Sequence, residues 1–292
     1  EKASDGRTIG EILLSIARGY AAGAPNGVRV DAESGLVWSP PHYTWMDTNY
    51  PAATPREGYP IELAALWIRL LRQLERRGAL GGDPHLVGLR AHAETSFSLY
   101  VRDDLPFLSD TLHAGPGTPA RDARADDHLR PNMLTAIALG IVKGERAKTS
   151  VASATRRLLV PGGMRSLAPL PVGYELPIHA PWGELLGDPH HPYRGRYEGD
   201  EDRQRKPAYH NGTAWVFPLA TYAEALVAAW DASPEARRAA RAILGSTAAH
   251  LDSGCVGQLP EVLDGDAPHL PRGCDAQAWS VTETLRVWLA LA

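Results

Sequence analysis

The sequence predicts an all-α protein, and three features of its 292 residues support that fold class. Apolar residues recur at the i, i+3, i+4, i+7 spacing of amphipathic helices in about eight segments. Strand-like alternation of apolar and polar residues is scarce. The stretches between the helical segments are long, and they hold most of the 24 prolines and many of the 28 glycines. We therefore expect helices joined by extended loops, with very little sheet.

The helical segments follow one another along the whole chain. The first covers residues 8–20, where isoleucine, leucine and alanine occupy one helical face. The second covers residues 60–77 and opens with Pro60, which suits the first turn of a helix because no amide donor is needed there. The first turns of this helix carry apolar residues on nearly every face, so we expect the helix to be buried on several sides. The other expected helices are residues 85–102, 131–144, 148–159, 213–230, 233–250 and 276–291.

The connecting segments are unusually long. They comprise residues 23–59, 105–130, 161–209 and 251–274. Loops of such length are usually functional or disordered. These contain tryptophan, tyrosine and histidine among the prolines and glycines, which does not match the composition of disordered chains. We expect ordered loops over one face of a helical scaffold, within a single domain spanning residues 1–292.

Composition and charge exclude several functional classes. The formal net charge is −4 and no block of lysine and arginine occurs, so neither a nucleic-acid partner nor an anionic membrane is indicated. No run approaches the roughly 18–20 apolar residues of a membrane helix, and the first residues lack the layout of a secretory signal. Two cysteines, Cys255 and Cys274, are too few for a disulfide framework. A cytoplasmic location is expected.

The first segment that carries chemistry is residues 39–62. It places Asp47, Arg56 and Glu57 among aromatic residues, just before a buried helix. A carboxyl group beside Trp45 and Met46 could lie in a partly dry pocket, where its pKa rises and it can act as a general acid. Taken alone, Asp47 would be a turn or cap residue. Arg56 and Glu57 alone would be an exposed ion pair of little consequence.

A second segment, residues 126–133, leads into an expected helix. Arg130 and Asn132 can offer several directional donors to hydroxyl oxygens, and Asp127 can accept hydrogen bonds from hydroxyl groups. The alternative is that Asp126 or Asp127 caps the helix and Pro131 lies in its first turn. The two readings are compatible.

A third segment, residues 209–215, also enters an expected helix. Gly212 would let the backbone come close to a ligand, and His210 and Trp215 are residue types that often contact sugars. A lone histidine in such a position is more often structural than catalytic.

The fourth segment is residues 257–280. Three acidic residues in this segment could in principle bind a metal ion, but their spacing does not match that of a calcium-binding loop. They are Glu261, Asp264 and Asp266. A loop glutamate followed by Gln277 and Trp279 better suits a base held beside a sugar pocket. The eight tryptophans against three phenylalanines agree with this reading, because the indole face stacks on sugar rings. No metal and no cofactor are expected.

Four stretches of these segments resemble the conserved blocks of bacterial and archaeal glycogen-debranching enzymes, the amylo-α-1,6-glucosidases. They are TWMDTNYPAATPREGYPIELAALW, RPNMLTAIAL, YHNGTAWVFPLATYAEAL and EVLDGDAPHLPRGCDAQAWSVTETLR. The resemblance extends over nearly the whole chain from Asp5 onward. Blocks of this length, in the same order, are far more specific than a short motif.

The resemblance implies a glucoamylase-like (α/α)6 toroid whose loops form a deep pocket at one end. It implies Asp47 as general acid and Glu261 as general base in an inverting hydrolysis of α-1,6-linked glucose on glycogen or limit dextrin. Inversion requires the two carboxyl groups to lie about 6.5–9.5 Å apart, with a water between one of them and the sugar. The implied substrate-binding residues are Trp45, Arg56, Glu57, Asp127, Arg130, His210, Trp215, Gln277 and Trp279.

The expected helices fall short of this fold. A toroid of six helix pairs needs about twelve helices, and about eight are indicated. We expect an incomplete toroid that lacks its first helices and the β-rich N-terminal domain of the family. Its inner surface near Ile61 and Trp67 would then be exposed, and the chain alone would be poorly stable or would self-associate. The alternatives are another helical-toroid α-glucosidase, glucoamylase-like or trehalase-like, and a non-catalytic glucan-binding fragment.

Overall fold

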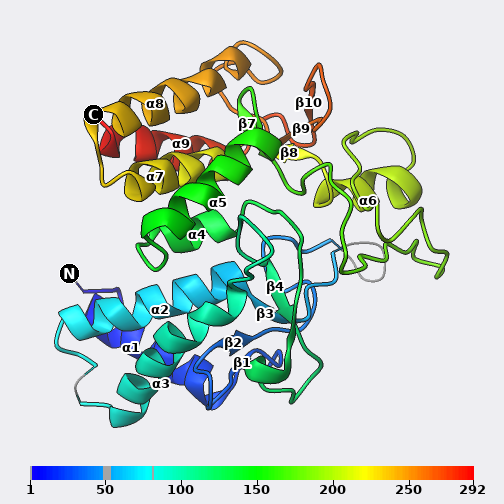
Figure 1. The fold of residues 1–292 in the computed structure, drawn as a ribbon. Helices are drawn as coiled ribbons and strands as arrows, with labels where there is room; N and C mark the ends of the chain where they lie inside the picture. Colours follow the sequence, from blue (N-terminus) through cyan, green and yellow to red (C-terminus); the bar gives the residue numbers. More distant parts are fainter. Residues whose placement is uncertain (1, 49–53, 81) are drawn as a thin grey trace.

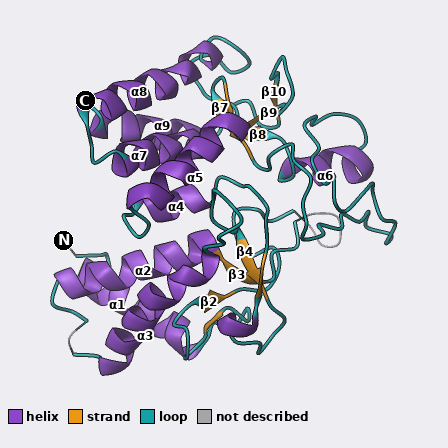
Figure 2. Cartoon of the chain, in the orientation of Figure 1, coloured by secondary structure: helices purple, strands orange, loops and turns teal. Residues whose placement is uncertain are grey.

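The computed structural model describes residues 2–48, 54–80 and 82–292. Within these ranges the regular structure is mainly helical, with nine α-helices and ten strands of two or three residues each. All the helices except the short α6 (Lys206–Tyr209) gather on one side of the molecule, and the strands with most of the long loops and α6 gather on the other (Figures 1 and 2). Both labelled chain ends lie on the helical side. The predicted arrangement of loops over one face of a helical scaffold is what the structure contains.

The first three helices agree closely with the sequence prediction. Helix α1 (Ile9–Ala22) begins after Thr8, whose side chain accepts a hydrogen bond from the Glu11 amide while Glu11 reaches back to Thr8. This reciprocal capping box satisfies two amides at the helix start. Helix α2 (Ile61–Arg76) follows Pro60, and α3 (Pro84–Ser96) is capped by Asp83 and continued by a short 3-10 turn.

The second half of the chain departs from the prediction in three places. The helix expected over residues 131–144 is shorter in the structure, where α4 covers only Met133–Ala138. Gly140, two residues after its end, has a left-handed backbone with φ of 67°, which is typical of a helix terminus. The helix expected over residues 213–230 begins only at α7 (Pro218–Ala229), because Ala214 and Trp215 form strand β8. The short helix α6 (Lys206–Tyr209) was not expected. The others are α5 (Gly144–Arg157), α8 (Pro234–Gly245) and α9 (Ala278–Ala290).

Helix packing produces two layers. Helices α2, α4, α7 and α9 contact one another in that order and form an inner row. Helices α1 and α3 pack against α2, while α5 and α8 pack against α7. Each inner helix thus precedes or follows, along the chain, an outer helix that it contacts, which is the arrangement of a toroid built from helix pairs.

The strands form three small antiparallel sheets. One pairs β1 (Arg29–Val30) with β2 (Val37–Trp38), and a second has the order β3 (Gly58–Pro60), β4 (Thr111–His113), β5 (Arg124–Ala125). The third has the order β10, β9, β8, β7, β6. Its strands are Pro271–Arg272, Val262–Leu263, Ala214–Trp215, Gly163–Arg165 and Leu159–Val160. These short sheets tie distant loops together at one end of the helices.

A large hydrophobic core extends from Ala17 in α1 to Leu291 after α9. The expectation that Ile61 and Trp67 would be exposed is wrong: their exposed fractions are 0% and 4%. Ile61 faces this core, and the Trp67 indole donates to the Gly35 carbonyl at 3.0 Å. The exposed apolar residue of α2 is instead Leu66. Within the part of the chain that the structure describes, no helix combines the length and apolar character of a membrane span.

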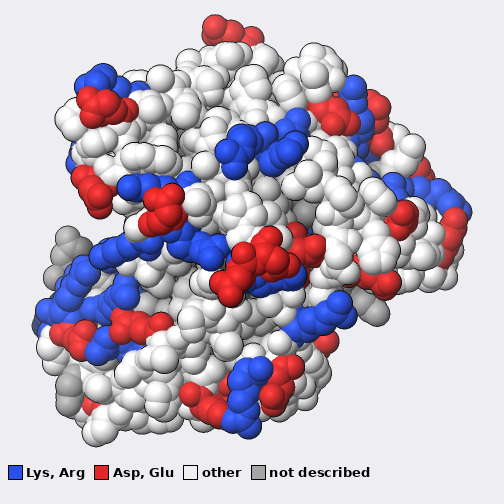
Figure 3. All heavy atoms as spheres, in the orientation of Figure 1, with Lys and Arg blue, Asp and Glu red and all other residues white. Residues whose placement is uncertain are grey.

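A band of basic side chains crosses one face of the molecule. On the face drawn in Figure 3, lysine and arginine side chains form a continuous band over the region of α2, and smaller groups of both charges lie elsewhere. The surface is indented between the α1–α3 group and the α7–α9 group.

Candidate active site

Tyr209 contacts Glu261, the candidate general base. Its hydroxyl group donates to Glu261 Oε1 at 2.5 Å. Burial is the largest cause that raises the pKa of Tyr209; the hydrogen bond and charge of Glu261 raise it further, and so does the charge of Asp47. Trp45, two residues before Asp47, and Tyr209 both contact the Trp215 ring, with centroids 5.3 and 4.8 Å away, so the loop before Asp47 meets the tyrosine that contacts Glu261. Tyr209 was part of a quoted motif but was not predicted as a site residue.

Glu261 is held by several donors. Besides Tyr209, the Gln277 side-chain amide donates to Oε1 at 3.3 Å, and the Cys274 amide donates to Oε2 at 3.2 Å. The backbone of Glu261 also donates to the Cys274 carbonyl at 2.8 Å, beside the β9–β10 hairpin. The sequence-predicted pair Glu261 and Gln277 is thus brought together by a turn of the chain.

Gly273 leaves the space that the Glu261 carboxylate occupies. A Cβ atom on Gly273, whose φ is 65°, would lie 2.6 Å from Glu261 Oε2. An added methyl group would push the flexible end of the glutamate aside, with a smaller effect on the rest of the fold.

We therefore expect Gly273→Ala to lower hydrolytic activity by about 10–100-fold, because a displacement of about 1 Å in a catalytic group has an effect of that size. Gly257→Ala is the matched control: Gly257 has a similar φ of 77°, but nothing lies within 4 Å of the added Cβ. Hydrolysis rates and melting temperatures of both variants check this. Equal rates for the two variants would show that the Glu261 position does not depend on Gly273.

An aromatic cluster lies between the loops that carry the carboxylates. The Trp45 ring meets Phe217, Trp215 and His210 edge-on, with centroids 4.9, 5.3 and 5.5 Å away. Trp215 is buried on β8, and its indole donates to the Tyr209 carbonyl at 2.8 Å. Trp279, 41% exposed, stacks on Phe217 with a centroid distance of 3.7 Å. Trp45 and Trp279 can offer ring surface to a ligand, whereas Trp215 forms the base beneath them.

His210 is fully buried against this cluster. Its ring stacks on Trp215 at 5.2 Å, and Nδ1 lies 2.5 Å from Thr48 Oγ1. Burial lowers the pKa of His210, so the ring is neutral. It supports the tryptophans rather than presenting a charge.

Arg56 does not form the exposed ion pair with Glu57 that the sequence suggested. Its side chain is 3% exposed and pairs with Glu62 at 2.5 Å and with Asp110 at 2.6 Å. Burial lowers the pKa of Arg56, but the charges of Asp110 and Glu62 outweigh burial and raise it. The guanidinium is therefore enclosed below the loop that carries Trp45.

Arg130 and Asp127 also hold backbone segments. Arg130 is buried, donates to the Ser166 carbonyl at 3.0 Å and to the His210 carbonyl, and burial lowers its pKa to about 10. Asp127 accepts from the amides of Gly173 and Tyr174 at 2.6 and 2.9 Å. In this structure both residues position loops around the candidate site.

Two cavities lie near these residues. A cavity of about 320 Å³ on the inner faces of α2, α4, α7 and α9 is lined by Trp45, Asn132, Phe217 and Trp279, among others. A larger one, about 610 Å³, is lined by Glu57, His113 and Tyr174. Asn132, in the second sequence block, connects to the first cavity: it accepts from the Trp45 indole at 2.7 Å and donates to Asp110 at 2.7 Å.

Comparison with known proteins agrees with this architecture. The family model described as amylo-alpha-1,6-glucosidase matches residues 6–286. The neutral trehalase Nth1 from Saccharomyces cerevisiae is similar in structure, with a TM-score of 0.50 and 12% identity over 80% of this chain and 38% of the trehalase chain. The GH63 mannosylglycerate hydrolase from Thermus thermophilus, in complex with glucose, gives a TM-score of 0.48 and 16% identity over 80% and 48% of the two chains. The chain thus spans less than half the length of either structure, and at 12% identity the trehalase likeness shows the shared toroid-type fold alone.

Proposed function

The chain belongs to the amylo-alpha-1,6-glucosidase family, and from this premise we propose that it is an inverting glycoside hydrolase that releases glucose from α-1,6 branch points of glycogen or limit dextrin. The observation that carries the proposal is the aromatic cluster that joins the two loops: Trp45, two residues before Asp47, contacts Trp215, and Tyr209 contacts Trp215 and donates to Glu261. The family match over residues 6–286 supports the substrate class.

In the proposed reaction Asp47 is the general acid. It protonates the glycosidic oxygen as the bond from that oxygen to C1 of the glucose stub breaks. Glu261 is the general base, which takes a proton from a water as the water oxygen forms a new bond to C1 on the opposite face. The product is glucose with inverted configuration, and inversion requires a carboxyl separation of about 6.5–9.5 Å.

The surrounding residues support these roles in different ways. Asp47 is exposed at the end of the Trp45–Met46 segment, where a bound sugar can reach it. Tyr209, Gln277 and the Cys274 amide orient the Glu261 carboxylate. Trp45 and Trp279 line a cavity of about 320 Å³, near the lower limit of about 300 Å³ for small-molecule sites, which suits a short sugar.

The remaining predicted residues enter the proposal as positioning groups. Arg56, Arg130, Asp127, His210 and Trp215 hold loops or rings in place, as their hydrogen bonds and stacking support. Glu57 lines the neighbouring cavity of about 610 Å³. We also treat residues 1–292 as one catalytic domain, supported by the core shared between α1 and α9.

The experiment that tests the proposal is a comparison of substrates with the full chain. Free glucose is expected from limit dextrin and from isomaltose-type stubs, at rates above those on maltooligosaccharides and trehalose. Faster hydrolysis of one of the latter two would assign the chain to a glucoamylase-like or trehalase-like activity instead. Glycogen binding without release of glucose would identify a non-catalytic glucan-binding module.

We also propose a cytoplasmic location for the protein. It is supported by Cys255 and Cys274, which are both exposed and free thiols.

We further propose that the chain self-associates. Self-association is supported by the exposed apolar residues Leu285, Trp288 and Leu289 on α9. Sedimentation over a range of concentrations tests it, and a monomer throughout would contradict it.

A further inference from the structure

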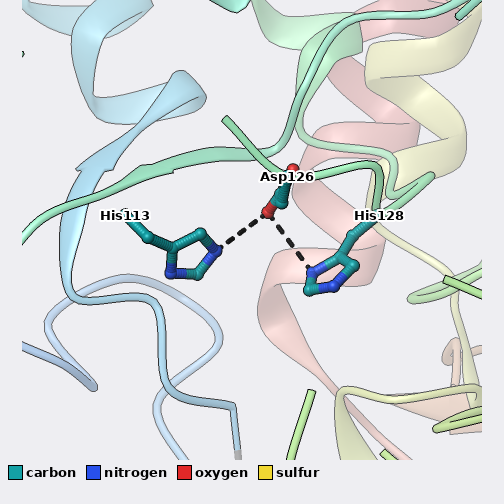
Figure 4. A group of neighbouring side chains, drawn as sticks. All are labelled: His113, Asp126 and His128. Atoms are coloured by element: carbon teal, nitrogen blue, oxygen red, sulfur yellow. Dashed lines mark hydrogen bonds and ion pairs between the residues drawn. The ribbon is translucent and has the colours of Figure 1, made fainter. Parts of the chain in front are cut away.

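Three side chains outside the candidate active site converge on one point. His113 Nε2 lies 3.1 Å from Asp126 Oδ2, and His128 Nδ1 lies 3.3 Å from the same oxygen (Figure 4). The three ligand atoms all lie within 4.8 Å of one another. The side chain of Asp126 is 0% exposed, that of His128 is 2% and that of His113 is 12%. Two imidazole nitrogens and one carboxylate oxygen are therefore collected in a nearly dry place.

Strand pairing brings these residues together. Strand β4 pairs with β5 so that His113 lies opposite Arg124 and Leu112 opposite Ala125. Asp126 follows β5, and its amide donates to the Thr111 carbonyl, so it extends the ladder by one residue. His113 and Asp126 are diagonal neighbours on one face of the pair, and His128 comes two residues later. No sequence motif signals this arrangement, because the first two ligands lie thirteen positions apart.

Each ligand that is fully buried has an orienting partner. Asp126 Oδ1 accepts from the Asp110 amide at 2.8 Å, which leaves Oδ2 for the cluster. His128 Nε2 lies 2.8 Å from the Tyr174 carbonyl, which can only accept a hydrogen bond. This contact fixes the proton on Nε2 and directs Nδ1 toward Asp126. Such outer hydrogen bonds orient the ligands of metal sites.

The electrostatics of the cluster call for a cation. With Nε2 protonated, a neutral His128 would point the lone pair of Nδ1 at a carboxylate oxygen, which is repulsive. A second proton or a metal ion must therefore lie between them. The buried groups nearby add to this requirement: Glu62, Asp110 and Asp126 carry three negative charges, against two positive charges on Arg56 and Arg130.

Two of the three separations between ligand atoms match those of a metal site. Zinc lies about 2.0–2.1 Å from imidazole nitrogen and about 2.0–2.2 Å from carboxylate oxygen, so two ligand atoms of a tetrahedral ion are about 3.3–3.5 Å apart. The two separations from Asp126 Oδ2 are 3.1 and 3.3 Å. We propose that His113, Asp126 and His128 bind one divalent transition-metal ion, with zinc as the best match. His113 also lines the cavity of about 610 Å³, from which water can fill a fourth position.

Hydrogen bonds connect this site to the loop of the candidate general acid. Asp126 accepts from Asp110, Asp110 accepts from Asn132 at 2.7 Å, and Asn132 accepts from Trp45 at 2.7 Å. Trp45 stands two residues before Asp47. A bound ion would stabilise this chain of contacts, so its role is structural. The proposal is independent of which sugar bond the protein hydrolyses.

The test uses the full chain, treated with a chelator, dialysed and titrated with Zn²⁺ alone. One ion per chain is expected, and Co²⁺ in its place is expected to give visible absorption of a nitrogen- and oxygen-coordinated ion. His113→Ala, at the most exposed ligand, is expected to weaken binding by at least about 10–100-fold, the loss that even outer-layer changes cause. His191→Ala is the matched control, because His191 is exposed and pairs with Asp188 away from the cluster.

A second readout separates binding from misfolding. Zn²⁺ is expected to raise the melting temperature of the unchanged protein and of His191→Ala, and to leave that of His113→Ala unchanged. If the unchanged protein takes up no ion, or if His113→Ala binds zinc as tightly as the control, the site is a proton-bridged cluster and the proposal is overturned.

Discussion

Glu261→Gln and Asp47→Asn are each expected to lower the rate of glucose release from limit dextrin by about 10²–10⁴-fold, the usual contribution of a general acid or base. Glutamine keeps the size of Glu261, and its one amide oxygen can still accept from either Tyr209 or Cys274, but it cannot take a proton from water. Asparagine cannot donate the proton that the leaving oxygen needs. Rates under saturating substrate measure both effects.

The control for these variants is a carboxylate on the same chain with no expected part in the reaction. Glu235 lies in the first turn of α8, and its side chain is 73% exposed. Glu235→Gln is expected to keep the original rate. Melting temperatures of all three variants should stay close to that of the unchanged protein. Near-normal rates for both Glu261→Gln and Asp47→Asn would rule out the assignment of the two carboxylates.

Arg56→Met is expected to lower the free energy of unfolding by about 3–5 kcal/mol, the effect of removing one partner from a buried ion pair. Arg56 donates to Asp110 at 2.6 Å and to both oxygens of Glu62 at 2.5 and 2.7 Å, with all three groups buried. Its loss leaves two carboxylates without their counter-charge in a low-dielectric interior. Urea unfolding of the full chain measures the change.

An exposed pair of the same kind provides the comparison. Arg238 donates to Glu235 at 2.8 Å, and the two side chains are 70% and 73% exposed. Arg238→Met is expected to change the free energy of unfolding by less than about 1 kcal/mol. If Arg56→Met has an effect as small as that, and instead weakens sugar binding, Arg56 contacts substrate and is not the structural residue that its burial indicates.

The elements that the sequence predicted well depend on neighbours along the chain. The periodic apolar face of α1 and its Thr8–Glu11 cap are local features, and the structure begins that helix at Ile9. Pro60 and the apolar run after it likewise placed α2 to within a residue at each end. Local interactions of this kind act between residues three or four apart, so their pattern is visible in the sequence itself.

The errors arise where distant strands compete with local propensity. Ala214 and Trp215 have neighbours compatible with a helix, yet they pair with Arg165 and Met164 on one side and with Leu263 and Val262 on the other. This pairing buries Trp215 beneath the candidate pocket. No periodicity in residues 213–217 reports partners some fifty positions away along the chain.

The sequence by itself determined the helical character of the chain, the family to which its four blocks belong, and the two carboxylates that we assign to catalysis. Only the tertiary structure decided what surrounds them. It paired Arg56 with Glu62 and Asp110, set Tyr209 against Glu261, and collected His113, Asp126 and His128 around one oxygen. The physical reason is that these contacts join loops far apart in sequence, and their geometry exists only once helix packing and strand register have fixed where each loop begins and ends.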